Sequence, residues 1–295
     1  MVSIVKRIPF FIAFIVSLCI SQSVEAQIRI KNAADTLLDM DTVDEFAIST
    51  SFITLGYVML YFCVSGLLEY TNPTPKTPKR MKWIKKEIRL GVFALIADVT
   101  YAGLWLWLVD RHTPYYGYYN THEFTAWSLL MNVLTYLFVF DTWFYWTHRF
   151  LHQKWWWKNV HVVHHKFMKP SAFAQDAVHP FEAVFQGPMG HHLVSLVYPM
   201  HPIVMAVMGA GTAIYASAAH DGRAGDLNDH NKHHTFMNVN FGLYWGVWDY
   251  ICGTRYDAKK RPAYKKIQEE YEKLTPNQDL IDGGVDALEC VDKQD

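Results

Sequence analysis

Long apolar segments alternate with polar, aromatic segments along the chain, and their lengths predict membrane-spanning helices. A helix needs about 20 predominantly apolar residues to cross the hydrocarbon core of a bilayer. The segments that satisfy this requirement are Phe46–Leu68, Leu90–Val109, Ala126–Thr147 and the interrupted segment Phe181–Ala219. The last of them is broken by Gly187-Pro188, Pro199 and Pro202. Because proline ends or kinks a helix, we expect a helical hairpin that enters and leaves the membrane on the same side.

The N-terminus has the organisation of a cleavable signal peptide. A basic start at Lys6 and Arg7 precedes an apolar run from Ile8 to Ile20, and Val24-Glu25-Ala26 follows it. The apolar run is short for a full span, which favours the signal peptide. The alternative is a first membrane anchor that stays in place.

The basic segment Thr71–Arg89 predicts how the chain is oriented. It carries seven lysines and arginines, and short loops rich in these residues stay in the cytosol. We therefore expect Leu90–Val109 to lead out of the cytosol and Ala126–Thr147 to lead back. The hairpin then returns the chain to the same side. The predicted divisions are 1–26 (signal-like or anchor segment), 27–89 (polar loop, first span and basic cytosolic loop), 90–256 (main membrane domain) and 257–295 (polar tail, its last fifteen residues mobile).

Composition supports a polytopic membrane protein. Hydrophobic residues make up 51% of the chain, charged residues only 19%, and the net charge is −1, so nothing in the composition supports nucleic-acid binding. The four cysteines are Cys19, Cys63, Cys252 and Cys290. They form no CxxC pair, which argues against a disulfide framework, a zinc finger and an iron–sulfur cluster.

Eight of the 15 histidines form three groups whose spacing fits one face of a helix. The groups are His148-x3-His152, His161-x2-His164-His165 and His230-x2-His233-His234. Residues three or four apart are neighbours on a helix, so each group can direct two or three imidazoles to one place. Neutral imidazole binds iron, zinc and copper well. The spacing therefore predicts a polyhistidine metal site, because histidines that merely line a lipid headgroup region would have no reason to repeat it.

Eight imidazoles are too many for one metal ion, so we expect two ions, each with three or four imidazoles plus oxygen ligands or water. Soluble di-iron bundles use glutamates and Glu-x-x-His, but carboxylates are few near these groups, and the His-Glu-x-x-His pattern of zinc hydrolases is absent. In a membrane the pattern fits two irons that activate O2 against a lipid C–H bond. Copper remains open on ligand grounds alone. The predicted fold is an all-α, polytopic membrane bundle of about four transmembrane helices, one pair as a hairpin, with a cytosolic histidine-rich di-metal cap.

Isolated polar residues add weaker predictions. Asp141 precedes His148 by seven residues on the same helical face, and could either orient a ligand imidazole or cap local polar groups. Asp98 lies inside a predicted span. Burying a carboxyl group in a membrane costs free energy, so such a residue is a candidate for a functional role. Of the remaining histidines, His191 and His192 in the hairpin could face the site. Three others, His112, His122 and His201, are expected to be structural.

The order HxxxH, HxxHH, hairpin, HxxHH resembles the fatty acid hydroxylase/sterol desaturase superfamily over residues 90–256. Asp141-Thr-Trp-Phe-Tyr-Trp-Thr-His148-Arg149 is similar to the family's lead-in to its first group. Other segments are most similar to sterol C-5 desaturases (lathosterol oxidases): His161-Val-Val-His-His-Lys166, Ala172-Phe-Ala174, His179-Pro180, Tyr198-Pro-Met-His201, His220-Asp221-Gly222, His233-His234-Thr235, Asn240-Phe-Gly242 and Leu243-Tyr-Trp-Gly-Val-Trp-Asp249. Two positions depart from that pattern. Phe181-Glu182 is closer to sterol C-4 methyl oxidases, and Leu243 stands where glutamine is usual.

The resemblance implies two iron ions, O2 as co-substrate, and electrons from NAD(P)H through cytochrome b5 and its reductase or an equivalent donor. It also implies a lipid or sterol substrate and a multi-pass protein of the endoplasmic reticulum whose metal site faces the cytosol. His220 joins the ligands on this basis, and His179 is a further candidate. The predicted set is His148, His152, His161, His164, His165, His220, His230, His233 and His234, with His179 in addition and Asp141 behind a ligand.

Three functions are compatible with these residues. The leading hypothesis is a sterol desaturase that introduces a C-5(6) double bond into a Δ7-sterol. The second keeps the metal site but hydroxylates, acting as a sterol C-4 methyl oxidase or on a fatty acyl chain. Both reactions share the first hydrogen abstraction, so the histidine groups cannot separate them. The third is a non-catalytic membrane scaffold, against which stands the fact that no histidine of the three groups is missing.

Overall fold

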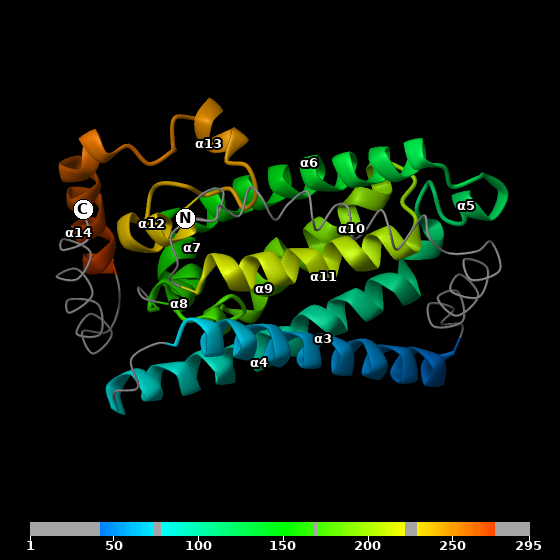
Figure 1. Ribbon diagram of the computed structural model, residues 1–295, viewed down its shortest axis with the longest axis horizontal. Coiled ribbons are helices and arrows are strands. Elements are labelled where there is room, and N and C mark those ends of the chain that lie inside the picture. Colours follow the sequence, from blue (N-terminus) through cyan, green and yellow to red (C-terminus); the bar gives the residue numbers. More distant parts are fainter. Residues whose placement is uncertain (1–41, 74–77, 168–169, 222–228, 275–295) are drawn as a thin grey trace.

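The computed structural model describes residues 42–73, 78–167, 170–221 and 229–274, which form helices and no strands (Figure 1). Four helices are long and apolar enough to cross a membrane: α3 (Val43–Thr71), α4 (Pro78–Leu108), α6 (Ala126–Leu151) and α11 (Pro202–Ala219). The predicted all-α bundle with four candidate spans is thereby confirmed. The predicted signal-like segment 1–26 and the last fifteen residues lie outside the described residues, as do Cys19, Cys290 and Gly222.

Shorter elements connect the long helices. They are η2 (Asp110–His112), α5 (Tyr118–Thr121), α7 (Lys154–Trp156), the π-helical turn η3 (Trp157–His161), α8 (Val162–His165), η4 (Ala172–Ala174), α9 (Pro180–Gln186), α10 (Pro188–Val197), α12 (His230–Phe236), α13 (Val247–Ile251), η5 (Ala258–Lys260) and α14 (Arg261–Leu274). In Figure 1, α7, α8, α12 and α14 gather at the left end of the bundle, and α5 lies at the opposite end. The elements that carry the histidine groups therefore share one end.

Local sequence signals fix where the long helices begin. Thr42 caps α3 in a capping box with Glu45: the Thr42 hydroxyl accepts the Glu45 N–H at 3.3 Å, and the Glu45 carboxylate accepts the Thr42 N–H at 2.9 Å. The Thr125 hydroxyl caps α6 by accepting the N–H of Ser128 at 3.1 Å. His201 caps α11, whose first residue is proline. These caps satisfy amide groups that have no partner in the first turn of a helix.

The basic segment predicted as a loop, Thr71–Arg89, is mostly helical, and this prediction was wrong. Helix α4 begins at Pro78, because a proline at the first position of a helix needs no N–H partner and has the backbone angle that a helix requires. Lysine and arginine are also good helix formers. The basic side chains described after it therefore line the first three turns of α4: Arg80, Lys82, Lys85, Lys86 and Arg89.

The predicted hairpin is present, with an outward leg made of two short helices. Gly187 leaves the helical conformation between α9 and α10 (φ −80°, ψ −95°), and Pro188 cannot donate a main-chain hydrogen bond. After the turn at 198–201, the unbroken helix α11 returns (Figure 1). Because of the break, α11 is the hairpin helix with the length and hydropathy of a span.

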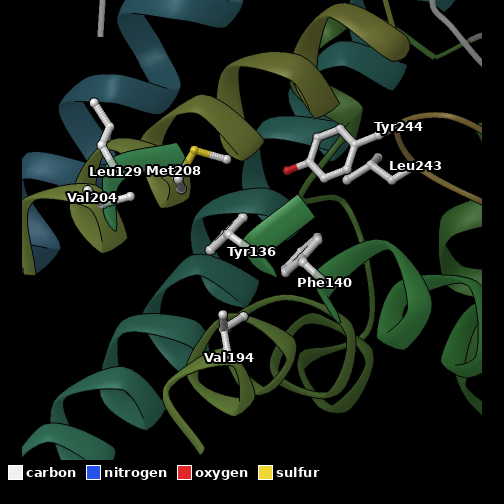
Figure 2. Packing of buried hydrophobic residues seen from close by; sticks show 8 residues of the cluster. All are labelled: Leu129, Tyr136, Phe140, Val194, Val204, Met208, Leu243 and Tyr244. Atoms are coloured by element: carbon white, nitrogen blue, oxygen red, sulfur yellow. The ribbon is translucent and has the colours of Figure 1, made fainter. Parts of the chain in front are cut away.

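A buried apolar cluster holds α6 against both legs of the hairpin. Tyr136 and Phe140 of α6 stack with ring centroids 5.6 Å apart. Figure 2 shows Val194 of α10 on one side of this pair and Tyr244, from the loop after α12, on the other. The other members are Leu129, Val204, Met208 and Leu243. This packing fixes the end of α6 relative to the loop that follows α12.

Helices α3 and α4 hold the loop that follows the second histidine group. The Tyr61 hydroxyl donates to the carbonyl of Phe173 at 2.8 Å, and the Ser65 hydroxyl donates to that of Ala172 at 3.0 Å. Buried Glu87 of α4 accepts a hydrogen bond from the Ser171 hydroxyl. These bonds satisfy main-chain groups that would otherwise be buried without partners, so the loop is fixed against the membrane helices.

Candidate metal centre

Nine buried histidine side chains converge at the end of the bundle where α6, α8, α11 and α12 meet. They form two groups, and within each group the candidate ligand atoms all lie within 4.8 Å of one another. The five-histidine group is His148, His152, His161, His165 and His233. The four-histidine group is His164, His220, His230 and His234. The structure thus brings together all eight histidines of the three sequence groups, and His220 with them.

Helix geometry explains how neighbouring histidines are divided between the two groups. Adjacent residues on a helix point about 100° apart, whereas residues four apart share a face. On α12, His230 and His234 therefore belong to the four-histidine group and His233 to the five-histidine group. The segment η3–α8 is divided in the same way. His161 and His165 belong to the five-histidine group, and His164 belongs to the four-histidine group. Each HxxHH motif therefore contributes to both groups.

The spacing of ring nitrogens in the five-histidine group fits a metal ion. Nε2 of His161 lies 3.0 Å from Nε2 of His152 and 3.1 Å from that of His165. Nε2 of His233 lies 3.0 Å from that of His165 and 3.3 Å from that of His152. A neutral imidazole has a single N–H, so this closed ring of nitrogens cannot be held by hydrogen bonds alone. Ligands at right angles around an ion with bonds of ~2.1 Å would be ~3.0 Å apart, so these residues fit a metal.

The opposite nitrogens of several rings are occupied by acceptors. Three Nδ1 atoms lie within hydrogen-bond distance of main-chain carbonyls: His148 with Phe241 (2.8 Å), His233 with Val239 (2.7 Å) and His220 with Ala216 (2.7 Å). A carbonyl can only accept, so the proton of each of these rings is on Nδ1. The Nε2 lone pair then faces the group, which is the arrangement that partners of metal-ligating histidines enforce.

Burial keeps these imidazoles neutral. Moving an imidazolium out of water is unfavourable, so burial, reinforced by neighbouring histidines, lowers the pKa values of His161, His165 and His234 well below the usual value. Burial likewise lowers the pKa of His220 to about 4. Neutral imidazole is the form that binds a metal, so the site is in its ligating state at neutral pH.

Glu182 is a site residue whose role the sequence did not reveal. Its Oε1 lies 2.6 Å from Nδ1 of His161, and both side chains are buried. Burial raises the pKa of Glu182, so an ionised carboxylate here needs a nearby positive charge. The contact joins α9 to η3 across 21 residues of sequence. The sequence signals were an acidic residue at the start of an apolar hairpin leg and the departure of Phe181-Glu182 from the C-5 desaturase pattern; neither indicated a contact with His161.

Asp141 acts on the main chain rather than on an imidazole. Its Oδ1 accepts the N–H groups of Leu243 at 3.2 Å and Tyr244 at 2.9 Å. Buried Asp249 accepts the two preceding N–H groups, those of Phe241 and Gly242, at 2.9 and 2.8 Å. Two carboxylates therefore hold the segment whose Phe241 carbonyl bonds His148. The main-chain groups that Asp141 caps lie 102 and 103 residues away in the sequence, so its contacts match neither the predicted orientation of an imidazole nor the predicted capping of local groups.

The other predicted histidines lie outside both groups. His179 caps α9, its Nδ1 accepting the N–H of Phe181 at 3.1 Å. His191 contacts the Tyr136 hydroxyl at 2.9 Å, and His192 stacks on Trp105 with centroids 5.4 Å apart. Neither hairpin histidine belongs to a candidate metal group. His201 has the structural role expected of it, as the cap of α11.

Comparison with known proteins identifies the segment that holds this centre. The sequence model of the fatty acid hydroxylase family matches residues 133–254. This segment is similar to the fatty acid hydroxylase family. It contains all nine histidines, Asp141 and Glu182, and it confirms the resemblance inferred from the sequence.

Several relatives of the fatty acid hydroxylase segment extend over most of the chain. Lathosterol oxidase of Homo sapiens is 27% identical over 231 residues, which cover 72% of this chain and 77% of that protein. Lathosterol oxidase of Mus musculus is 26% identical over 253 residues, 79% of this chain and 84% of that protein. Delta(7)-sterol 5(6)-desaturase of Candida glabrata is 26% identical over 237 residues, 76% of this chain and 65% of that protein. No solved structure matches. The family and these relatives indicate an oxidoreductase.

Beyond the family match, α14 covers the five-histidine group. The Tyr271 hydroxyl donates to the carbonyl of His152 at 2.9 Å. Trp157 lies between this tyrosine and the group, its ring 4.5 Å from that of Tyr271 and 4.8 Å from that of His165. The segment predicted as a polar tail, 257–295, therefore contains a helix that closes one side of the site.

Proposed function

We propose that the chain is an iron- and O2-dependent membrane sterol desaturase that introduces a C-5(6) double bond into a Δ7-sterol. The observation that carries the proposal is the pair of adjacent, buried, all-imidazole groups at one end of four apolar helices. The similarity to relatives named as lathosterol oxidases and sterol desaturases supports the choice of substrate. The proposal accounts for the membrane helices and for the double metal site together.

The nine histidines would hold two irons, one in each group. Bound there, the irons would supply the activation of O2 that cleavage of a sterol C–H bond requires. In the overall reaction O2 takes two hydrogens from the sterol and two electrons and two protons from the donor, and leaves as two waters. Nine neutral imidazoles would leave the charge of two bound ions largely uncompensated, and Glu182 behind His161 places a carboxylate in contact with the set.

The surrounding side chains orient the ligands and keep water out. The fixed Nδ1 contacts of His148, His220 and His233 prevent their rings from turning. The rings of Trp157 and Phe241 pack 5.1 and 5.0 Å from that of His152. A dry site protects a reactive oxidant from side reactions with solvent, so this enclosure suits the oxidation of a sterol carbon.

The direction of the helices supports a metal site on the cytosolic side, and the similarity to lathosterol oxidases supports the endoplasmic reticulum as the membrane. The basic first turns of α4 lie at the same end as α8 and α12 (Figure 1), and basic residues flanking a span favour the cytosol. A cytosolic site would receive electrons from NAD(P)H through cytochrome b5 and its reductase or an equivalent donor.

The test is sterol profiling of a host that lacks its own C-5 desaturase and expresses this chain. Accumulation of the Δ5,7 product is expected, and His164→Ala should abolish it because a ligand is lost. Lys166→Ala, two residues away and without a ligand role, is the matched control and should keep most activity. Oxidation of a 4-methyl sterol or hydroxylation of an acyl chain without Δ5,7 product would replace this proposal with the hydroxylase alternative. Metal binding without O2 consumption on any lipid would favour the scaffold.

A further inference from the structure

The short helix α13 exposes apolar side chains at the histidine end of the bundle. Within residues 245–251 the exposed side chains are those of Trp245, Val247, Tyr250 and Ile251, a set called here the α13 face. Tyr250 and Ile251 are 76% and 64% exposed, and none of the four is charged. A helix at a water-facing surface has the opposite arrangement, with its apolar side inward. The α13 face therefore indicates an apolar environment outside the chain.

Helix α14, at the same end of the bundle, has the ordinary arrangement. It buries Tyr264 and Gln268, and between these and Tyr271 it exposes only charged side chains: Lys265, Lys266, Glu269 and Glu270. On α13 the buried side chain is instead the carboxylate of Asp249, which accepts main-chain N–H groups. An apolar exposed side is thus a property of α13 and not of every helix at this end.

A stripe of exposed apolar side chains on α6 leads toward the α13 face. It consists of Trp127, Leu130, Leu134, Phe138 and Trp146, whose spacing places them on one side of the helix. Trp146 follows Trp127 by 19 residues, a rise of ~29 Å, and the hydrocarbon core of a bilayer is ~30 Å thick. Tryptophan is enriched at both boundaries of that core. Trp146 therefore marks the boundary on the histidine side.

Contacts place α13 at this boundary. The rings of Trp248 and Trp146 have centroids 5.7 Å apart, and Nε1 of Trp248 donates to the Thr142 hydroxyl at 2.9 Å. Because Thr142 lies one turn before Trp146, Trp248 reaches ~6 Å inside the boundary. Helices that lie in a membrane surface bury their apolar side ~5–10 Å deep. In Figure 1, α13 lies beside the histidine end of α6, on the side away from α3 and α4.

Exposed arginines lie next to the α13 face. Arg149 follows Trp146 by three residues, with its guanidinium carbon 5.9 Å from the centre of that ring, and Arg255 follows α13 directly after a short turn. Long basic side chains near the end of a span extend toward the headgroups, and anionic lipids attract them. An apolar face with basic residues beside it is complementary to a phospholipid leaflet.

We propose that the α13 face is an interfacial membrane anchor, inserted into the headgroup–acyl boundary of the leaflet on the histidine side. The buried side of α13 joins this anchor to the candidate metal centre. Asp249 accepts the N–H groups of Phe241 and Gly242, and the Phe241 carbonyl contacts Nδ1 of His148. The leaflet thereby fixes the depth of the loop that orients this histidine. The anchor serves any lipid substrate, so it does not depend on the desaturase proposal.

The test measures the depth of single nitroxide labels by electron paramagnetic resonance. The full chain, with its four cysteines replaced by serine, receives one new cysteine and is reconstituted into vesicles of phosphatidylcholine and phosphatidylserine. Collisions of the label with O2, which concentrates in hydrocarbon, are compared with collisions with a water-soluble nickel complex. The test positions are Tyr250→Cys and Ile251→Cys. Phe138→Cys in the middle of the α6 stripe is the lipid reference, and Lys266→Cys on α14 is the water reference.

Labels at Tyr250 and Ile251 are expected to collide with O2 more often than with the nickel complex, and to meet the nickel complex several-fold less often than the label at Lys266. Nickel access equal to that at Lys266 would overturn the anchor. Low access to both reagents would also overturn it, because a protein partner or a second copy would then cover the face. Nickel access at Phe138 would show that α6 does not span the bilayer, and the anchor would fall with it. Melting temperatures in detergent equal to that of the unlabelled chain confirm that the labelled variants are folded.

Discussion

Replacement of Glu182 by glutamine is expected to weaken metal binding in the five-histidine group. The carboxylate lies 2.6 Å from Nδ1 of His161, and the two side chains are 1% and 0% exposed. Glutamine keeps an oxygen that accepts the Nδ1 proton, but it removes the negative charge that faces the ion through the ring. The perturbation is therefore electrostatic, with the packing of α9 against η3 nearly unchanged.

The magnitude follows from the bond that is altered. A hydrogen bond to a charged group contributes ~1.5–3 kcal/mol and a neutral one ~0.5–1.5 kcal/mol, so the exchange removes ~1–1.5 kcal/mol before the loss of attraction to the ion is added. Residues that orient metal-ligating histidines typically contribute 10–100-fold in metal affinity, which is ~1.4–2.7 kcal/mol. We expect Glu182→Gln to fall in that range.

The assay is the metal content of the purified full chain after equilibration with a graded series of iron chelator. Glu182→Gln should lose half of its iron at a chelator activity ~10–100-fold lower than the wild type. Glu270→Gln is the matched control, because Glu270 is exposed and pairs only loosely with Lys154 at 3.7 Å, and its curve should overlay that of the wild type. If Glu182→Gln retained iron as tightly as the wild type, with unchanged circular dichroism, the role assigned to this carboxylate would be wrong.

Three further substitutions test the framework of the site. Asp249→Ala leaves two buried main-chain N–H groups without an acceptor and should lower the free energy of unfolding by ~2–6 kcal/mol, seen as a lower melting temperature in detergent. Gly91→Ala places a methyl group 2.6 Å from the Tyr61 hydroxyl and should lower the free energy of unfolding by ~1–3 kcal/mol. Gly56→Ala is the control, because the space around Gly56 is open. Equal melting temperatures of the two variants would contradict the packing of α3 against α4. His179→Ala removes a helix cap and should lose ~1 kcal/mol of stability while both irons remain; loss of an iron would make His179 a ligand.

The spans could be predicted because their signal is local. Length and hydropathy suffice to mark α3, α4, α6 and α11, whatever packs around them. The start of α4 was misplaced because lysine and arginine indicate membrane side, not backbone conformation. A proline in a basic, polar segment is compatible with a loop, but proline also begins helices, as Pro78 begins α4.

The candidate ligands could be predicted because helical spacing places them on one face before any tertiary structure forms. Their partners could not. Asp141 shares a face with His148, but seven residues of helix separate the two by ~10 Å, so the carboxylate reaches the main chain of another segment. Glu182 meets His161 only because the hairpin returns α9 to η3. Such contacts depend on how distant elements dock, which no spacing within one element encodes.

The division of each HxxHH motif between the two groups has a mechanical consequence. The helices α8 and α12 span four and seven residues, and each reaches both groups, so neither helix can shift or rotate to suit one ion without displacing ligands of the other. Two ions bound by these groups would therefore share a single rigid frame. A centre built in this way should bind and release both ions together. Replacing one ion by an ion of different radius should also change the ligand geometry at the other group, one helical turn away.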